Sequence, residues 1–170
     1  KENRAAIAPF VKGKTVLDCF THTGSFALVN PGRAYFGEKD FQQIAGIKAM
    51  VAQLGIDIEI VECAIVRGED GLALSSRNEL LTPEHRNAAP HIYATISQCS
   101  EKMATMSPEE LTEWVVKSID SNPLLKTIYF EAVDARSMQR VERWSDSERI
   151  QGCCAVQAGD IRLIDNIKIK

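Results

Sequence analysis

The sequence lacks any apolar run that approaches the roughly 20 residues needed to cross a bilayer. Its start, Lys1 to Pro9, mixes charges with alanines and lacks the apolar core of a signal peptide. The sequence also lacks a large excess of charge of either sign, since its formal net charge is -3 over 170 residues. A basic footprint for nucleic acid or an anionic membrane is therefore absent, and we expect neither kind of partner.

Cysteine and histidine are too few and too scattered to suggest a metal site. The five cysteines are odd in number and lack metal-ligand spacing. Cys153 and Cys154 are adjacent within an apolar run, which is typical of buried thiols. This usage favours a reducing cytoplasm, and no metal-ligating residue is predicted.

What the sequence does contain is enough apolar material, 45% of all residues, for the core of one or two small domains. Ala34 to Phe36 is a short apolar strand closed by Gly37. The apolar spacing from Phe41 to Leu54 predicts a helix with Gly55 just after its end, and Ile56 to Ile60 alternates like a strand. These elements predict one βαβ unit of a parallel sheet.

Upstream of this unit, Thr15 to Asp18 is predicted to be a strand that leads into a turn at Thr21 to Gly24. Ser25 to Val29 is long enough for about one helical turn before Pro31 and Gly32 stop it.

After residue 69 the chain changes character, and we place a domain boundary there. Thr82 and Pro83 predict the start of a helix toward Met103, in which Pro90 predicts a kink or a late start. Ser107 to Glu110 combines a first-turn proline with a capping box. Three strands are predicted, the last two joined by a tight hairpin at Ala158 to Asp160: Ile128 to Val133, Cys153 to Gln157 and Ile161 to Ile164. This half should be a small antiparallel α+β domain.

Two polar stretches carry the candidate chemistry. Gly37 to Asp40 lies between a strand end and a helix start, where backbone N–H groups favour anions and Lys39 adds a charge for phosphate. Leu74 to Asn78 combines hydroxyls with the guanidinium of Arg77, which suits phosphate oxygens. An ordinary solvated turn remains the alternative for each stretch. Gln43, one helical step past Asp40, can face the same crevice or plain solvent.

Each stretch alone is a weak signal, but together and in this order the stretches are specific for one protein family. Val29 to Lys170 resembles the second half of the pantothenate synthetases. The signature segments that carry the resemblance are Arg33 to Gln43, Asp70 to Asn78, Tyr129 to Ala135 and Arg162 to Ile167.

The resemblance implies an α/β protein, in which a truncated Rossmann-like parallel βαβ unit is followed by a small α+β C-terminal lid domain. It implies ATP-dependent condensation of pantoate with β-alanine through pantoyl adenylate, with Mg²⁺ on the triphosphate. Gln43 matches a pantoate-binding position. ATP contacts are implied at Gly37, Glu38, Lys39, Asp40, Val66, Leu74, Ser75, Ser76 and Arg77; of these, Lys39, Ser75, Ser76 and Arg77 would stabilise the reacting phosphate.

The resemblance is incomplete, because the family's His-x-x-His motif has no counterpart among His22, His85 and His91. Instead, Glu2 to Arg4 and Val16 to Leu28 are similar to the first cofactor motif of class I S-adenosylmethionine-dependent ribosomal RNA cytosine methyltransferases. We expect three parts. Residues 1–28 should form a methyltransferase-motif-like strand and turn, residues 29–69 a remnant of the Rossmann-like ATP-binding domain, and residues 70–170 the C-terminal lid domain. ATP is the expected ligand rather than S-adenosylmethionine, and ligase activity should be low.

Two alternatives remain open for such a chimeric fragment. One is a methyltransferase-type S-adenosylmethionine binder. The other is an inactive remnant that self-associates as a homo-oligomer through an exposed sheet edge.

Overall fold

The computed structural model describes residues 32–170, which belong to two compact units divided between Ala64 and Ile65. We call these the N-terminal unit and the C-terminal unit. The division falls slightly before the boundary expected after residue 69. The predictions for residues 1–28, the strand at Thr15 to Asp18 among them, lie outside the described residues.

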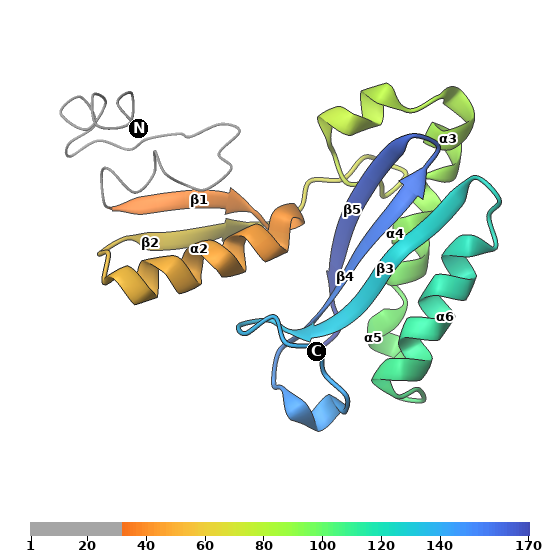
Figure 1. Ribbon diagram of the computed structural model, residues 1–170. Coiled ribbons are helices and arrows are strands. Elements are labelled where there is room, and N and C mark those ends of the chain that lie inside the picture. Colours follow the sequence, from red (N-terminus) through yellow and green to blue (C-terminus); the bar gives the residue numbers. More distant parts are fainter. Residues whose placement is uncertain (1–31) are drawn as a thin grey trace. The chain divides into compact units, whose positions relative to one another are not determined.

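The N-terminal unit is a strand–helix–strand element (Figure 1). Strand β1 (Arg33–Gly37) leads through a short 3-10 helix, η2 (Glu38–Asp40), into helix α2 (Phe41–Leu54), and strand β2 (Glu59–Cys63) follows. The two strands pair in parallel, from Arg33 with Glu59 to Gly37 with Cys63. The predicted βαβ unit is confirmed.

Helix α2 ends where the sequence predicted. Gly55 adopts a φ of +61°, and the N–H of Ile56 donates to the carbonyl of Val51 at 3.1 Å. A left-handed residue of this kind satisfies the last carbonyls of the helix, which is why glycine stands there. The helix buries Ile44 and Ile47 against Phe36 of β1.

The predicted start of strand β2 lies too early in the sequence, since the strand begins at Glu59. Ile56 and Ile58 are partly buried against the α2–β1 core, but they belong to the connection that precedes the strand. The N–H of Ile58 donates to the carbonyl of Ile56 at 3.0 Å, so this stretch turns locally before it pairs with β1. The alternation of isoleucines with polar residues therefore predicted correctly which side chains are buried. It did not predict where the strand begins, because that depends on the position of the partner strand.

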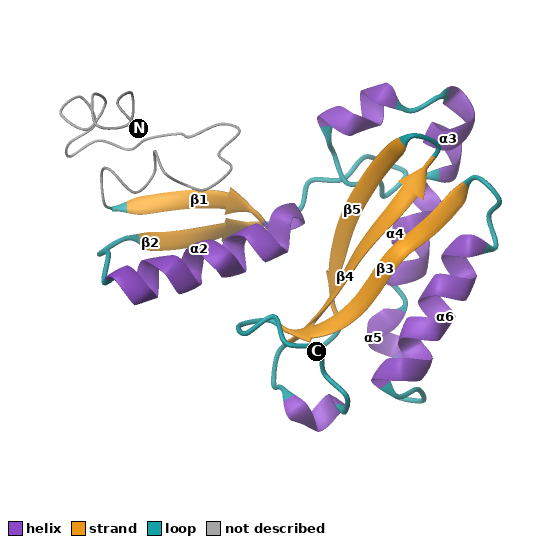
Figure 2. Ribbon diagram, in the orientation of Figure 1, coloured by secondary structure: helices purple, strands orange, loops and turns teal. Residues whose placement is uncertain are grey.

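The C-terminal unit is a three-stranded antiparallel sheet with helices on one face (Figure 2). Its order is β3 (Leu125–Asp134), β4 (Ile150–Ala158), β5 (Ile161–Lys168). Gly159, at a φ of +59°, and Asp160 form the predicted turn between β4 and β5. The strands extend beyond their predicted apolar runs because pairing continues through polar residues, and the predicted antiparallel α+β unit is confirmed.

The central strand β4 lines the core of this unit. Its Cys154 and Val156 pack, almost fully buried, against Ile96, Leu111 and Ile119 of the helices. The prediction of buried thiols is confirmed for the cysteine pair, since Cys153 and Cys154 are 4% and 2% exposed. This burial raises the pKa of Cys154 and raises that of Cys153 to about 12. Both sulfurs are therefore protonated at neutral pH and act as small apolar side chains.

The single helix predicted from Pro83 toward Met103 is instead three helices, α3 (Pro83–Ala88), α4 (Pro90–Ile96) and α5 (Cys99–Lys102). The first break confirms the interruption predicted at Pro90, which has no N–H to continue the helical ladder, whereas the second, between Ile96 and Cys99, was not predicted. The start was predicted correctly, since the Thr82 hydroxyl accepts from the N–H of His85 at 3.4 Å.

Helix α6 (Pro108–Asp120) begins with the predicted capping box. The Ser107 hydroxyl accepts from the N–H of Glu110 at 3.2 Å, and the Glu110 carboxylate accepts from the N–H of Ser107 at 2.7 Å.

Across residues 32–170, no helix combines the length and apolar character that crossing a membrane requires.

Asp134, at the end of β3, organises the loop that leads to β4. One carboxylate oxygen accepts from the Ser147 hydroxyl at 2.5 Å, and the other accepts from the N–H and hydroxyl of Ser137 at 2.6 and 2.7 Å. These donors, with the Ser147 hydroxyl foremost, hold the pKa of Asp134 far below its usual range. The ionised form is therefore the one that the fold stabilises.

Replacement of this carboxylate, Asp134→Asn, should lower the unfolding free energy at pH 7 by about 1–2 kcal/mol. Because the folded pKa of Asp134 is depressed, its stabilisation is complete above about pH 4 and is lost as pH falls through the folded pKa. Wild type and variant should converge in acid. Urea unfolding followed by the fluorescence of Trp114 and Trp144, the two tryptophans of the chain, reports on this unit.

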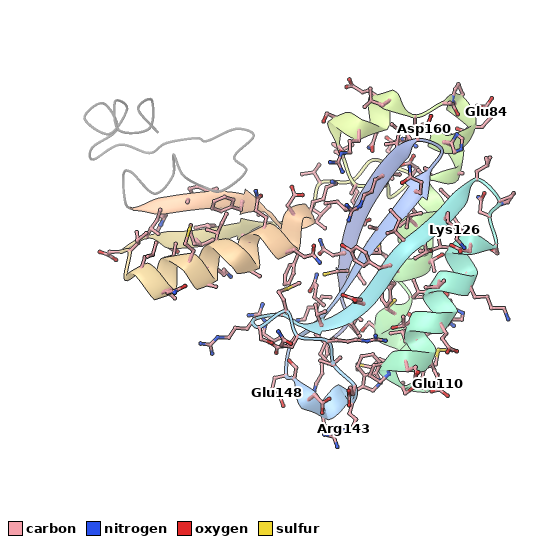
Figure 3. All side chains as sticks on the ribbon, in the orientation of Figure 1. Glu84, Glu110, Lys126, Arg143, Glu148 and Asp160 are labelled. Atoms are coloured by element: carbon pink, nitrogen blue, oxygen red, sulfur yellow. The ribbon has the colours of Figure 1, made fainter. Side chains whose placement is uncertain are left out.

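The matched control is Glu148→Gln, because Glu148 is exposed in the same loop (Figure 3). A stability gap for Asp134→Asn that stays equal from pH 7 down to strong acid would contradict the assignment.

Candidate functional site

The first predicted site segment, Gly37 to Asp40, lies in the N-terminal unit between the end of β1 and the start of α2. Its predicted place at a strand end before a helix is confirmed. Glu38 and Lys39 are partly buried and Asp40 is exposed. No side-chain cap bonds the first turn of α2, whose N-cap residue is Asp40. This is the end of the helix that favours anions.

Gly37 leaves open space beside this turn. Its φ of -72° is ordinary for any residue, and a Cβ built on it meets no heavy atom within 4 Å. Neither backbone conformation nor packing among the described residues therefore requires glycine here.

Gln43 lies in the first turn of α2 and is partly buried, three positions after the exposed Asp40. Its predicted contact with pantoate stays a prediction.

The second predicted segment lies in the C-terminal unit, on a loop that folds back on itself. The N–H of Leu74 donates to the carbonyl of Val66 at 2.9 Å, and the N–H of Gly68 donates to the carbonyl of Leu72 at 2.9 Å. The loop thus brings together Val66 and Leu74, two of the predicted ATP contacts. Both are exposed apolar side chains, 67% and 56% accessible, so they offer an apolar surface to a ligand.

The hydroxyl and guanidinium groups follow directly. Ser75 caps the 3-10 helix η3 (Ser76–Leu80), its hydroxyl accepting from the N–H of Arg77 at 3.3 Å. The Arg77 guanidinium donates through Nη1 to the carbonyl of Arg162, on edge strand β5, at 3.1 Å. Ser76 and Arg77 are exposed, and a guanidinium has five donors, so this short helix can present hydroxyl and cationic groups to phosphate.

Sequence reasoning missed Arg67, the most constrained residue of this loop. Its guanidinium makes a bidentate pair with Asp165 of β5, at 2.6 and 2.9 Å, and lies 3.7 Å from the ring centroid of Tyr93 in α4. The side chains of Arg67 and Asp165 are only 15% and 6% exposed. One signal was available, because Asp165 stands in an apolar strand and a buried carboxylate needs a partner.

A second anchor holds the middle of the loop. Asp70 accepts from Arg86 of α3 at 2.6 Å and from the N–H of Leu72 at 3.1 Å. The Arg86 guanidinium, ahead of the Leu72 amide, lowers the pKa of Asp70. The Asn78 amide then donates to the carbonyl of Ala73 at 3.0 Å, which fixes the start of η3.

The two described histidines have structural partners. His85 Nδ1 lies 2.8 Å from the Thr82 hydroxyl, and His91 Nε2 lies 2.9 Å from the carbonyl of Ser118. Within residues 32–170 there is no group of three or more side chains suited to hold a metal ion. The exposed hydroxyl and guanidinium groups of Ser76 and Arg77, with Val66 and Leu74 beside them, suit an anion that has an apolar part.

Comparison with known proteins connects these loops to one family. A model of the pantoate–beta-alanine ligase family matches residues 22–168. The match begins before Val29, inside the stretch that resembles a methyltransferase motif.

Several curated relatives are pantothenate synthetases. The chain is 50% identical over 143 residues to that of Porphyromonas gingivalis, a match that covers 84% of this chain and 51% of the relative. It is 49% identical over 145 residues to that of Bacteroides fragilis, with 85% and 51% covered. The chain thus spans about half the length of the curated relatives it matches.

Solved structures give the same result. Pantothenate synthetase from Thermus thermophilus superimposes with a TM-score of 0.77 at 36% identity, covering 85% of this chain and 52% of that one. Pantoate–beta-alanine ligase from Francisella tularensis, complexed with beta-gamma ATP and beta-alanine, gives 0.58 at 30% identity, covering 85% and 47%.

The loop geometry predicts a high sensitivity at Gly71. This residue has a φ of +84°, and a Cβ on it would lie 2.6 Å from Cδ1 of Tyr93. Gly71→Ala should therefore lower the unfolding free energy by about 1–3 kcal/mol through backbone strain and displacement of the ring. Urea unfolding followed by tryptophan fluorescence measures the loss. Glu69→Ala, at an exposed position of the same loop, is the control, and equal stability of the two variants would refute the prediction.

Proposed function

The chain belongs to the pantoate–beta-alanine ligase family, and we propose on this basis that it serves pantothenate biosynthesis. The reaction is the ATP-dependent condensation of pantoate with β-alanine through a pantoyl-adenylate intermediate. ATP and β-alanine are the ligands named for the related Francisella structure, which supports them as ligands of this chain as well. A cytoplasmic location agrees with the free thiols of Cys63, Cys99, Cys153 and Cys154.

The observation that carries the proposal is the anchored loop of the C-terminal unit, which presents Ser76 and Arg77 at the exposed start of η3. We assign ATP contacts there to Val66 and to Leu74 through Arg77. In the N-terminal unit we assign them to Gly37, Glu38, Lys39 and Asp40, where the open side of Gly37 admits a ligand. Gln43 is assigned to pantoate.

In the first step, the carboxylate of pantoate attacks the α-phosphorus of ATP and pyrophosphate leaves. Negative charge then gathers on the oxygens of the α-phosphate. The Arg77 guanidinium, the Lys39 ammonium and the hydroxyls of Ser75 and Ser76 would stabilise that charge. Mg²⁺ commonly binds through nucleotide phosphates, so it would be held chiefly by the triphosphate.

In the second step, the amine of β-alanine attacks the acyl carbon of the adenylate, and AMP leaves as the amine loses its proton. Both steps need substrates held in contact, which the family achieves with parts that this sequence does not match. None of its three histidines forms a His-x-x-His motif. We therefore propose that the chain retains ATP recognition and has little ligase activity by itself.

Calorimetric titration tests the assignment of the ligand. ATP should give binding heat, and S-adenosylmethionine should give none. Heat with S-adenosylmethionine alone would favour the methyltransferase-like segment as the binding element, and heat with neither would contradict ATP recognition. Release of AMP in the presence of pantoate and β-alanine then measures what ligase activity remains.

Arg77→Met tests the role of the loop. Removal of a charge-assisted contact to phosphate should weaken ATP binding about tenfold or more, while the unfolding midpoint stays near that of wild type because Arg77 is exposed. The control is Arg136→Met, an exposed arginine on a different loop. Equal ATP affinity in the two variants would remove Arg77 from the site.

A further inference from the structure

We propose that Arg67 is a positioning residue, whose contacts set the geometry of the nucleotide-binding loop without touching the nucleotide. The inference rests on the proposed function and deepens it, because it explains how the exposed residues of the loop are held in place before a ligand arrives.

The Arg67 guanidinium is held on all sides. Both of its terminal nitrogens donate to the Asp165 carboxylate, Nη1 also donates to the carbonyl of Gly71 at 3.2 Å, and Nη2 to that of Asn166 at 3.4 Å. One face of the fork lies against the ring of Tyr93. A planar, bidentate group of this kind fixes orientation as well as distance, which the point charge of a lysine does not.

The constraint passes to the candidate site through the backbone. Arg67 pairs with Ala73 in an isolated antiparallel bridge, and the residues next to that pair, Val66 and Leu74, are joined by their own hydrogen bond. The carbonyl of Ala73 then accepts a hydrogen bond from the side-chain amide of Asn78, a residue of η3. The orientation of Arg67 thus determines where Leu74 and the start of η3 lie on the edge of β5.

Stability alone is a poor explanation for this pair. Taking two charges out of water costs free energy that their attraction only partly offsets, and apolar side chains of similar volume often hold a fold equally well. The planar guanidinium instead fixes the relative positions of its partners. It contacts Asp165 of strand β5, the ring of Tyr93 on α4 and the carbonyl of Gly71 in the loop.

Amide hydrogen exchange on the chain without nucleotide tests positioning directly. In Arg67→Lys, the loop amides of Gly68, Leu74 and Asn78, which donate within the loop, should exchange about tenfold faster or more. The amide of Leu111 in α6 serves as the internal reference and should be unchanged. Arg143→Lys, in an exposed ion pair with Asp146 far from this loop (Figure 3), is the matched control. Unchanged exchange of the loop amides in Arg67→Lys would overturn the inference.

A double variant, Arg67→Met with Asp165→Leu, separates positioning from stability and covers the case in which a single variant fails to fold. It should unfold nearer the wild-type midpoint than Arg67→Met alone, although the N–H of Asn166 loses its bond to Asp165, and it should bind ATP about tenfold more weakly. Wild-type ATP affinity in the double variant would overturn the inference. Absence of ATP binding by wild type would instead defeat the proposed function, while the exchange experiment, which uses no nucleotide, still decides the role of Arg67.

Discussion

The bidentate contact between Arg67 and Asp165 is the constraint on which the candidate site of the C-terminal unit depends. It ties the start of an irregular loop to strand β5, far along the chain. The loop buries Leu72 and Ala73, and the tie adds a fixed position for its polar and glycine residues, whose ordering costs conformational entropy. With it, Ser76 and Arg77 project from one defined place on the edge of the sheet.

The rest of the unit makes that contact possible. Strand β4 supplies a fully buried centre, and the helices cover one face of the sheet, so β5 offers a rigid base for the loop. Tyr93 of α4 places its ring against the Arg67 guanidinium. Elsewhere in the same unit, the Asp134 carboxylate orders the connection between β3 and β4 in the same manner, by gathering donors around one ionised group.

The two units expose different chemical groups at their candidate segments. At the end of β1, the N-terminal unit offers a helix start, a lysine and the open side of a glycine. The C-terminal unit offers hydroxyls and a guanidinium on an anchored loop. Both suit an anion, in keeping with membership of a family of ATP-dependent ligases. The chain spans about half the length of its curated relatives.

Local signals in the sequence determined the βαβ order, the end of α2 at Gly55, the capping box at Ser107 and the turn at Gly159, since each depends on residues a few positions apart. They also placed Gly37 to Asp40 between a strand end and a helix start, whereas Leu74 to Asn78 was predicted as loop and contains the start of η3. The first break in the expected helix toward Met103 is also local, because it falls at Pro90. The late start of β2 and the Arg67–Asp165 pair were decided by tertiary structure. Each depends on groups that only folding brings together, since β2 pairs with β1 and a charge pair separated by most of the domain leaves no periodic trace in the sequence.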